Sequence, residues 1–493
     1  MQPQTGERLP ERSTYSTSPA IPRMWPGDPR TTGPGDPQLL QVDPDEGPGE
    51  PAAKIEQRET RKSEPSAQAV PEGAARAAGE ASGQDAAAFK MVTVFYGTDR
   101  KKIAAEPTDV ARRQRLTLAL CTAAATLLCG GLGVAGVKRV FTIPLAALFV
   151  AATIGLGIYW AGGELEQMRR LVETDVRYGN ERGVMQLGTC RVSIPSTHVR
   201  GELESPSIIR LEVREDASRH VVLQAIEPAS DEDFYEALRA RVAAASRSEV
   251  FVFVHGYNVT FEDAARRTAQ IAHDVQFAGA PIFFSWPSQG GLLRYTVDET
   301  NVAWAVPHLK QFLLDVVQHS GADSVNLIAH SMGNRAMTEA LCDLQAQFRE
   351  GPALFHQVVL AAPDIDAEIF ERDLAPALVK SAQRVTLYAS SNDQALIASK
   401  KFHGYARAGD SGDGLVVIPG IETVDVSALD TSLLGHSYYG SSNPVLSDIR
   451  QLIHDSLPAA QRPWLLPKMR GELTYWVFEK IRDTASRTVP PTR

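Results

Sequence analysis

An apolar run that stops at a serine constrains this chain more than any other feature of its sequence. Residues 324–329 (SVNLIA) are largely apolar and partly β-branched, as in a buried strand, and a helix-compatible stretch begins at Ala336. Ser331 and Gly333 lie between the two. A strand that turns sharply into a helix at a serine is typical of a nucleophile elbow, which exposes the serine Oγ at the edge of a sheet. The pattern predicts that Ser331 is a nucleophile; a serine that caps a buried helix is the alternative.

A second buried strand is predicted upstream, at residues 250–254 (VFVFV), where every side chain is apolar. It ends in His255 and Gly256, and a glycine lets the backbone approach a substrate closely. We expect the backbone N–H groups of Tyr257 and Met332 to form an oxyanion hole, since both would lie beside the nucleophile. His255 is expected to brace the loop rather than to take part in catalysis.

The acid and the base should follow the serine along the chain, in that order. Asp393 comes after the buried run at residues 384–389 and is the predicted acid, while Asp364, after the preceding run, is the alternative. Either aspartate could instead cap a helix. His436 lies next to a glycine after the strand-like residues 422–426, and we predict that it is the general base.

Several short motifs together resemble a family of bacterial proteins. These motifs are residues 92–100 (VTVFYGTDR), 178–179 (YG), 253–258 (FVHGYN), 284–288 (FSWPS) and 329–334 (AHSMGN). They resemble a family of esterase- and lipase-like α/β-hydrolases whose members are largely uncharacterised, and the resemblance covers most of residues 91–460. It implies a catalytic triad of Ser331, Asp393 and His436, and it implies no cofactor.

In this mechanism His436 would take the proton of Ser331 as the hydroxyl attacks an acyl carbon, and Asp393 would orient the imidazole. Gly256, Asn258 and Trp286 are expected to line the substrate pocket. Trp286 follows the predicted strand at residues 281–284, so ordinary core packing is the alternative for it. No metal site is expected.

Between the opening segment and the rest of the domain, the sequence contains two apolar stretches. Residues 116–137 and 140–160 are each about 20 residues long, enough for a helix to cross the hydrocarbon core of a bilayer. Only Lys138 and Arg139 separate them, which predicts a transmembrane hairpin rather than a pair of buried core helices. Basic residues before and after the hairpin predict that the catalytic domain faces the cytoplasm from the inner membrane.

We therefore predict an α/β fold with a doubly wound, mostly parallel sheet, an antiparallel edge within residues 184–226, and an inserted two-helix transmembrane hairpin. The predicted divisions are a disordered polar tail (1–90), a first strand segment (91–110), the hairpin (116–160), the α/β-hydrolase catalytic domain (171–460) and a C-terminal tail (461–493).

The predicted function is a membrane-anchored serine hydrolase that cleaves small-molecule or lipid carboxylic esters. An acyltransferase, thioesterase or amidase with the same triad, and a non-catalytic membrane scaffold, are the alternatives. The net charge of −9 argues against nucleic acid as a partner. The cysteines, at positions 121, 129, 190 and 342, have no metal-binding or redox spacing, so disulfides are not expected. The sequence does not determine an oligomeric state.

Overall fold

A computed structural model describes residues 88–104, 176–206, 215–289, 294–429 and 444–478. The predicted polar tail up to residue 87, the predicted hairpin at residues 116–160 and His436 lie outside these ranges. The last two residues of the predicted tail are instead part of a strand that begins at Phe89, because the backbone there pairs with Pro195 and Ile194. Among the helices within the ranges, none has both the length and the apolar character needed to cross a membrane.

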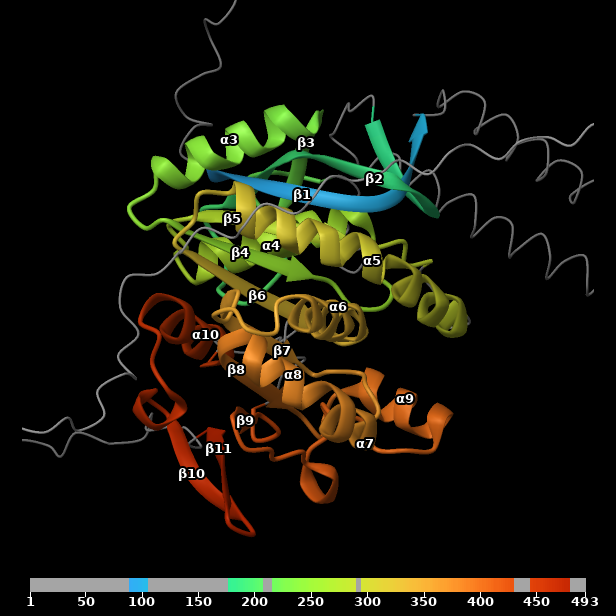
Figure 1. Ribbon diagram of the computed structural model, residues 1–493. Helices are drawn as coiled ribbons and strands as arrows, with labels where there is room; N and C mark the ends of the chain where they lie inside the picture. The colour runs from blue at the N-terminus through green and yellow to red at the C-terminus, as the bar shows by residue number, and fades with distance from the viewer. Residues whose placement is uncertain (1–87, 105–175, 207–214, 290–293, 430–443, 479–493) are drawn as a thin grey trace, which may run out of the picture. The chain divides into compact units, whose positions relative to one another are not determined.

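The described chain forms an 11-stranded sheet in the order β10-β11-β9-β8-β7-β6-β4-β5-β1-β2-β3 (Figure 1). Every pair from β1 across to β11 is parallel, whereas β2, β3 and β10 pair antiparallel at the two ends. The strands are β1 (Phe89–Ala104), β2 (Val176–Pro195), β3 (Val222–Ala229), β4 (Glu249–Val254), β5 (Ala280–Ser285), β6 (Ser324–His330), β7 (Phe355–Ala361), β8 (Ala382–Ala389), β9 (Ile421–Asp425), β10 (Leu465–Arg470) and β11 (Leu473–Phe478). The mostly parallel α/β sheet and its antiparallel edge are as predicted.

Helices cover both faces of this sheet. Apolar residues of α4 and α10 join the core cluster on one face, whereas on the other face α6 packs against both α5 and α8. The helices are α3 (Asp231–Ala243), α4 (Phe261–Asp274), α5 (Tyr295–His319), α6 (Gly333–Gln347), α7 (Ala367–Ile369), α8 (Ala375–Ser381), α9 (Gln394–His403) and α10 (Pro444–His454), with a π-helical turn at Phe370–Leu374 and 3₁₀ turns at Gly412–Gly414 and Ala459–Gln461.

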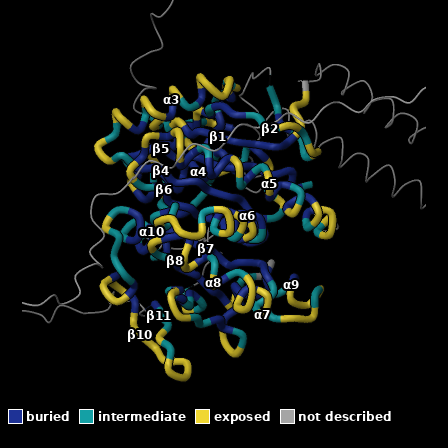
Figure 2. Tube along the Cα trace, viewed as in Figure 1, coloured by how far each residue is buried: buried dark blue, intermediate teal, exposed yellow. Residues whose placement is uncertain are grey.

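The strand sequences explain this layering. All six residues of β4 and all six of β5 are buried, because both strands are covered on both faces (Figure 2). Two of the helices on the sheet start at hydroxyl caps: Ser230 caps α3, and Thr260 caps α4 by accepting a hydrogen bond from the backbone N–H of Asp263 (3.1 Å).

The sheet extends further toward the C-terminus than predicted. β10 and β11 form a hairpin, and β11 pairs in parallel with β9. A domain boundary at residue 460 would cut through the sheet, so residues 465–478 belong to the same fold. This hairpin was not predicted because β10 is exposed at five of its six positions and lacks a buried apolar run.

Candidate active site

Ser331 lies in a sharp turn between a strand and a helix. β6 ends at His330 and α6 begins at Gly333, so a two-residue turn separates them. Ser331 has a φ of 51°, in the left-handed region that residues with a side chain rarely adopt. Its N–H donates to the carbonyl of Ala361 at 2.9 Å, which fixes the turn against β7. This is the geometry of a nucleophile elbow, and backbone strain of this kind is concentrated at functional sites.

Two glycines let the elbow and the loop after β4 come into contact. A Cβ atom at Gly333 would lie 2.3 Å from the carbonyl oxygen of His255 and 2.8 Å from that of Val254. A Cβ atom at Gly256 would lie 3.0 Å from the Cβ of Ser331. The backbone at Gly256 therefore lies directly beside the serine, as the pocket prediction for this residue requires.

The arrangement of strands accounts for this juxtaposition. β4 lies between β5 and β6, so the chain leaves β4 toward one side and returns on the other. Ligands of open α/β sheets bind at such a switch point, beyond the C-terminal ends of the strands. The loop of Gly256 and the elbow of Ser331 follow the two strands at that point. We call this edge of the sheet the catalytic edge.

The predicted oxyanion donors lie on this edge. Met332 is buried at the start of α6, and its N–H makes no hydrogen bond to any residue in the described ranges. Tyr257 is half-buried in the loop after β4, and its ring centroid lies 5.4 Å from that of Tyr295. An unused N–H beside a nucleophile is what an oxyanion hole needs, because the developing charge can take it as a donor.

The side chain of His255 is buried, and both of its ring nitrogens lie within hydrogen-bonding distance of a partner. Its Nδ1 lies 2.8 Å from the carbonyl oxygen of Gly256, which can only accept, so this nitrogen carries the hydrogen. Its Nε2 lies 3.1 Å from Ser285 Oγ. Burial, reinforced by the nearby charge of Arg100, lowers the pKa of His255 to about 3, so the ring is neutral. As expected, His255 braces the loop.

The structure corrects the pocket role expected for Trp286. Its side chain is completely buried, its indole N–H donates to the carbonyl of His255 at 2.8 Å, and its ring stacks on the imidazole. The side chain therefore packs behind the loop, because β5 directs it into the core. Asn258 adopts a left-handed φ of 57° and is exposed, so its contact with substrate stays a prediction.

Arg100, at the end of the first motif, is a supporting residue that the sequence did not single out. Its guanidinium is buried and donates to the carbonyls of Val259 (2.7 Å) and Ser288 (3.3 Å). It also donates to Ser285 Oγ at 2.8 Å. Burial lowers its pKa to about 10, so it remains charged at neutral pH. One side chain thus ties together the loops after β4 and β5.

Asp393, the predicted acid, lies on the same edge of the sheet. It follows β8, which is two strands from β6 in the sheet, and its Oδ1 accepts a hydrogen bond from the N–H of Leu396 at 3.0 Å. Its negative charge acts on His330, the neighbour of Ser331: burial lowers the pKa of that imidazole, and Asp393 opposes the shift. The carboxylate is therefore near the elbow, although it also caps α9.

Asp364, the alternative acid, is held in a dense network. Its carboxylate accepts hydrogen bonds from Arg407 (2.9 Å), Ser399 (2.6 Å), Arg335 (3.3 Å) and the hydroxyl of Tyr295. Burial raises its pKa, but the two guanidinium groups outweigh this effect and lower it. With its oxygens already occupied by four donors, Asp364 is suited to stabilising the fold.

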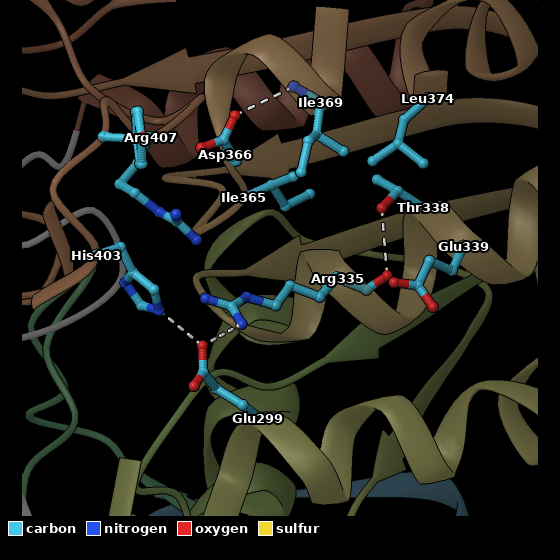
Figure 3. A pocket seen from close by; sticks show the side chains of 11 residues that line it. Glu299, Arg335, Thr338, Glu339, Ile365, Asp366, Ile369, Leu374, His403 and Arg407 are labelled. Carbon is cyan, nitrogen blue, oxygen red and sulfur yellow. Dashed lines mark hydrogen bonds and ion pairs between the residues drawn. The ribbon is translucent and has the colours of Figure 1, made fainter. Parts of the chain in front are cut away.

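A cavity of about 370 Å³ opens beside this network, with Glu299 between His403 and Arg335 (Figure 3). It is lined by Glu299, Arg335, Thr338, Glu339, Ile365, Asp366, Ile369, Leu374, His403, Tyr405 and Arg407. Ser331 is not among these residues, so the cavity flanks the elbow. Within the described ranges, no group of three His, Cys, Asp or Glu side chains is placed to bind a metal ion.

His436 lies outside the described residues, so the meeting of the three triad residues stays a prediction.

A family model described as "alpha/beta hydrolase of unknown function (DUF900)" matches residues 230–455. No curated protein matches the chain. The chain is also similar to a crystal structure of a predicted CIB-like hydrolase from Thermoplasma acidophilum. The two are 15% identical, the match covers 48% of this chain and 91% of that one, and the TM-score is 0.24. The family match and the fold confirm the predicted resemblance: residues 230–455 are similar to an α/β-hydrolase family of unknown function.

Proposed function

We propose that this protein is a membrane-anchored serine hydrolase that cleaves carboxylic esters through an acyl-enzyme on Ser331. The observation that carries the proposal is the elbow. Ser331 is held with a φ of 51° beside the backbone of Gly256 and next to the N–H of Met332, which donates to no residue in the described part of the chain. A nucleophile, a closely approaching backbone and a free donor are the parts that acyl transfer requires.

The chemistry would proceed in two steps. The Oγ of Ser331 attacks the ester carbonyl as His436 takes its proton, and the N–H groups of Met332 and Tyr257 stabilise the oxyanion. The bond between the acyl carbon and the alcohol oxygen breaks, and His436 protonates the departing alcohol. Water then attacks the acyl-enzyme with His436 as base, which releases the carboxylic acid and restores Ser331.

Asp393 is proposed to orient His436. Two observations support it over Asp364: its charge acts on the residue before Ser331, whereas the carboxylate of Asp364 is already bound to Arg335 and Arg407. Loss of the acid in such a triad lowers kcat by about 10⁴-fold.

The membrane anchor is proposed from the apolar stretches at residues 116–137 and 140–160. The ends of β1 and β2 support it, because Ala104 is paired with Val176. The chain therefore leaves and re-enters the fold at one place, as an even number of membrane crossings requires. By the basic flanks, the catalytic domain would lie on the cytoplasmic side.

A fluorophosphonate probe tests the nucleophile. The wild type should be labelled and Ser331→Ala should not, while Ser391→Ala, which removes an exposed serine near the same edge, should label like the wild type. Equal labelling of the wild type and Ser331→Ala would refute the assignment. Turnover of an ester in water, with and without an added alcohol, then separates hydrolysis from acyl transfer.

Hydrolysis of a p-nitrophenyl ester tests the acid. We expect Asp393→Asn to lower kcat by about 10³–10⁴-fold and Asp364→Asn to lower it less than tenfold in the fraction that remains folded. The opposite ranking would assign the acid to Asp364. For the anchor, a cysteine introduced after Lys138 should react with an impermeant reagent from the outer face of the membrane, and protection there would reverse the proposed orientation.

A further inference from the structure

The segment with the two apolar stretches is attached at the catalytic edge of the sheet. β1 is parallel to β5, β5 to β4 and β4 to β6, so the C-terminal end of β1 is on the same edge as Ser331. β2 starts at Val176, paired with Ala104 at the end of β1. Residues 105–175 are therefore joined to the fold at the edge that carries the nucleophile, and not at the opposite edge (Figure 1).

Large apolar side chains are exposed at the same edge. Val297, in the first turn of α5, is 46% exposed, and Phe402, in the last turn of α9, is 65% exposed. The ring of Phe402 lies 5.8 Å from that of Tyr295, which lies 5.4 Å from that of Tyr257 in the predicted oxyanion loop. With Tyr405, which is 66% exposed, Val297 and Phe402 form what we call the apolar rim.

Exposed lysines lie on the same edge of the sheet, one of them next to the apolar rim. Lys401 lies next to Phe402 on α9, and Lys102 lies near the end of β1. Both are exposed and form no ion pair with the described residues, unlike Lys400, which pairs with Asp410. Exposed apolar side chains beside lysines are the composition of surfaces that lie in the interface of an anionic bilayer.

We propose that the catalytic edge rests on the lipid bilayer, with the apolar rim in the interfacial layer, and that the substrates are esters that reside in the bilayer. The substrate class rests on the proposed serine-hydrolase function. Two features favour the bilayer as the partner: residues 105–175 are joined to the fold at this edge, and the apolar rim exposes large apolar side chains. An ester leaving the bilayer at this edge would reach Ser331 without crossing bulk water, so a long acyl chain would not have to be exposed.

The first test measures depth and does not depend on activity. Full-length protein with Phe402→Cys, reconstituted in vesicles that contain anionic lipid, is labelled with a polarity-sensitive fluorophore. Met469→Cys is the control, because Met469 is 61% exposed near the end of β10, which runs antiparallel to β11 and therefore ends at the opposite edge of the sheet. Protein without added cysteine gives the background of the native thiols.

Lipids brominated on their acyl chains should quench the label at position 402 at least twofold and leave the label at 469 unchanged. Equal quenching at the two positions, or none at either, would overturn the proposed contact with the bilayer. Quenching at 469 alone would place the opposite edge of the sheet against the membrane and would refute the proposal.

The second test addresses the substrate. The double variant Val297→Ser, Phe402→Ser should hydrolyse a long-chain ester embedded in vesicles at least fivefold more slowly than the wild type, with unchanged hydrolysis of water-soluble p-nitrophenyl acetate. Met469→Ser should match the wild type on both. Wild-type rates on both esters in the double variant would overturn the substrate class. A wild type that cleaves neither ester would refute the serine-hydrolase function, while the depth measurement would still decide whether the edge contacts the bilayer.

Discussion

Gly333 is the residue at which packing and catalysis can be tested by the smallest change, the addition of one methyl group. The Cβ of Gly333→Ala would lie 2.3 Å from the carbonyl oxygen of His255, whereas ordinary van der Waals contact begins at 3.4 Å. The difference, about 1.1 Å, must be taken up by backbone, because both partners are main-chain atoms. Either the elbow or the loop after β4 has to move by roughly that amount.

A displacement of about 1 Å in a positioned catalytic group lowers the rate by about 10²-fold, and overpacking of a core costs about 1–3 kcal/mol. We therefore expect Gly333→Ala to lower kcat for a p-nitrophenyl ester about a hundredfold and to lower the free energy of unfolding within that range. The measurements are steady-state kinetics and denaturant titration of the detergent-solubilised full chain.

Gly351→Ala is the matched control, because its added Cβ would meet nothing closer than 3.6 Å. Kinetics and stability of this variant should equal those of the wild type. A wild-type kcat in Gly333→Ala would show that the close contact between the elbow and the loop does not determine the catalytic geometry.

Three further predictions concern charged groups. Burial lowers the pKa of His198, but hydrogen bonds to Asp274 and Glu204 outweigh this effect and raise the pKa from 6.5 to about 9. A group whose pKa is raised in the folded state stabilises the fold fully below its unfolded pKa and loses this contribution as the pH rises through its folded pKa. In denaturant titrations, the free energy of unfolding of the wild type should therefore exceed that of His198→Gln most below pH 6.5, and this difference should fall by about 3 kcal/mol as the pH rises through 9. Arg462→Met should lower the free energy of unfolding by about 3–5 kcal/mol, because it leaves the buried carboxylate of Asp448 without its cationic partner at 2.8 Å; a loss below 1 kcal/mol would contradict this. Arg100→Lys, which removes the forked donor beneath the oxyanion loop, should lower kcat more than tenfold and leave KM within about threefold, whereas an equal change in both would indicate a general structural role.

The sequence was informative where one strand sets the geometry. The buried runs before Ser331 and Gly256 predicted both strands within one or two residues, because continuous apolar composition is a local signal. The elbow followed from the same pattern, since a serine and a glycine after a strand restrict the possible turns. The exposed strand β10 has no such signal and was missed.

Contacts between residues that are distant along the chain could not be predicted from the sequence. Arg335 and Arg407 lie 29 and 43 residues from Asp364, so nothing local distinguished this aspartate, a member of a salt-bridge network, from a catalytic acid. Arg100 donates to Val259, 159 residues away, and a single arginine at the end of a strand gives no indication of such a contact. Both assignments require the sheet order, which pairs β1 with β5 and brings the loops together.

The histidines near the elbow also determine how the pH dependence of activity should be interpreted. Burial lowers the pKa of His255 to about 3, and burial likewise lowers that of His330, so neither gains a proton close to neutral pH. A fall in kcat/KM on acidification with an apparent pKa of about 6–7 would therefore come from another base, and of the three residue types in the predicted triad only histidine has an ordinary pKa in that range. The same limb in a His436→Gln variant that keeps residual activity would exclude this histidine as the general base. Its loss there, with fluorophosphonate labelling of Ser331 also abolished, would establish that the serine depends on that imidazole for its reactivity.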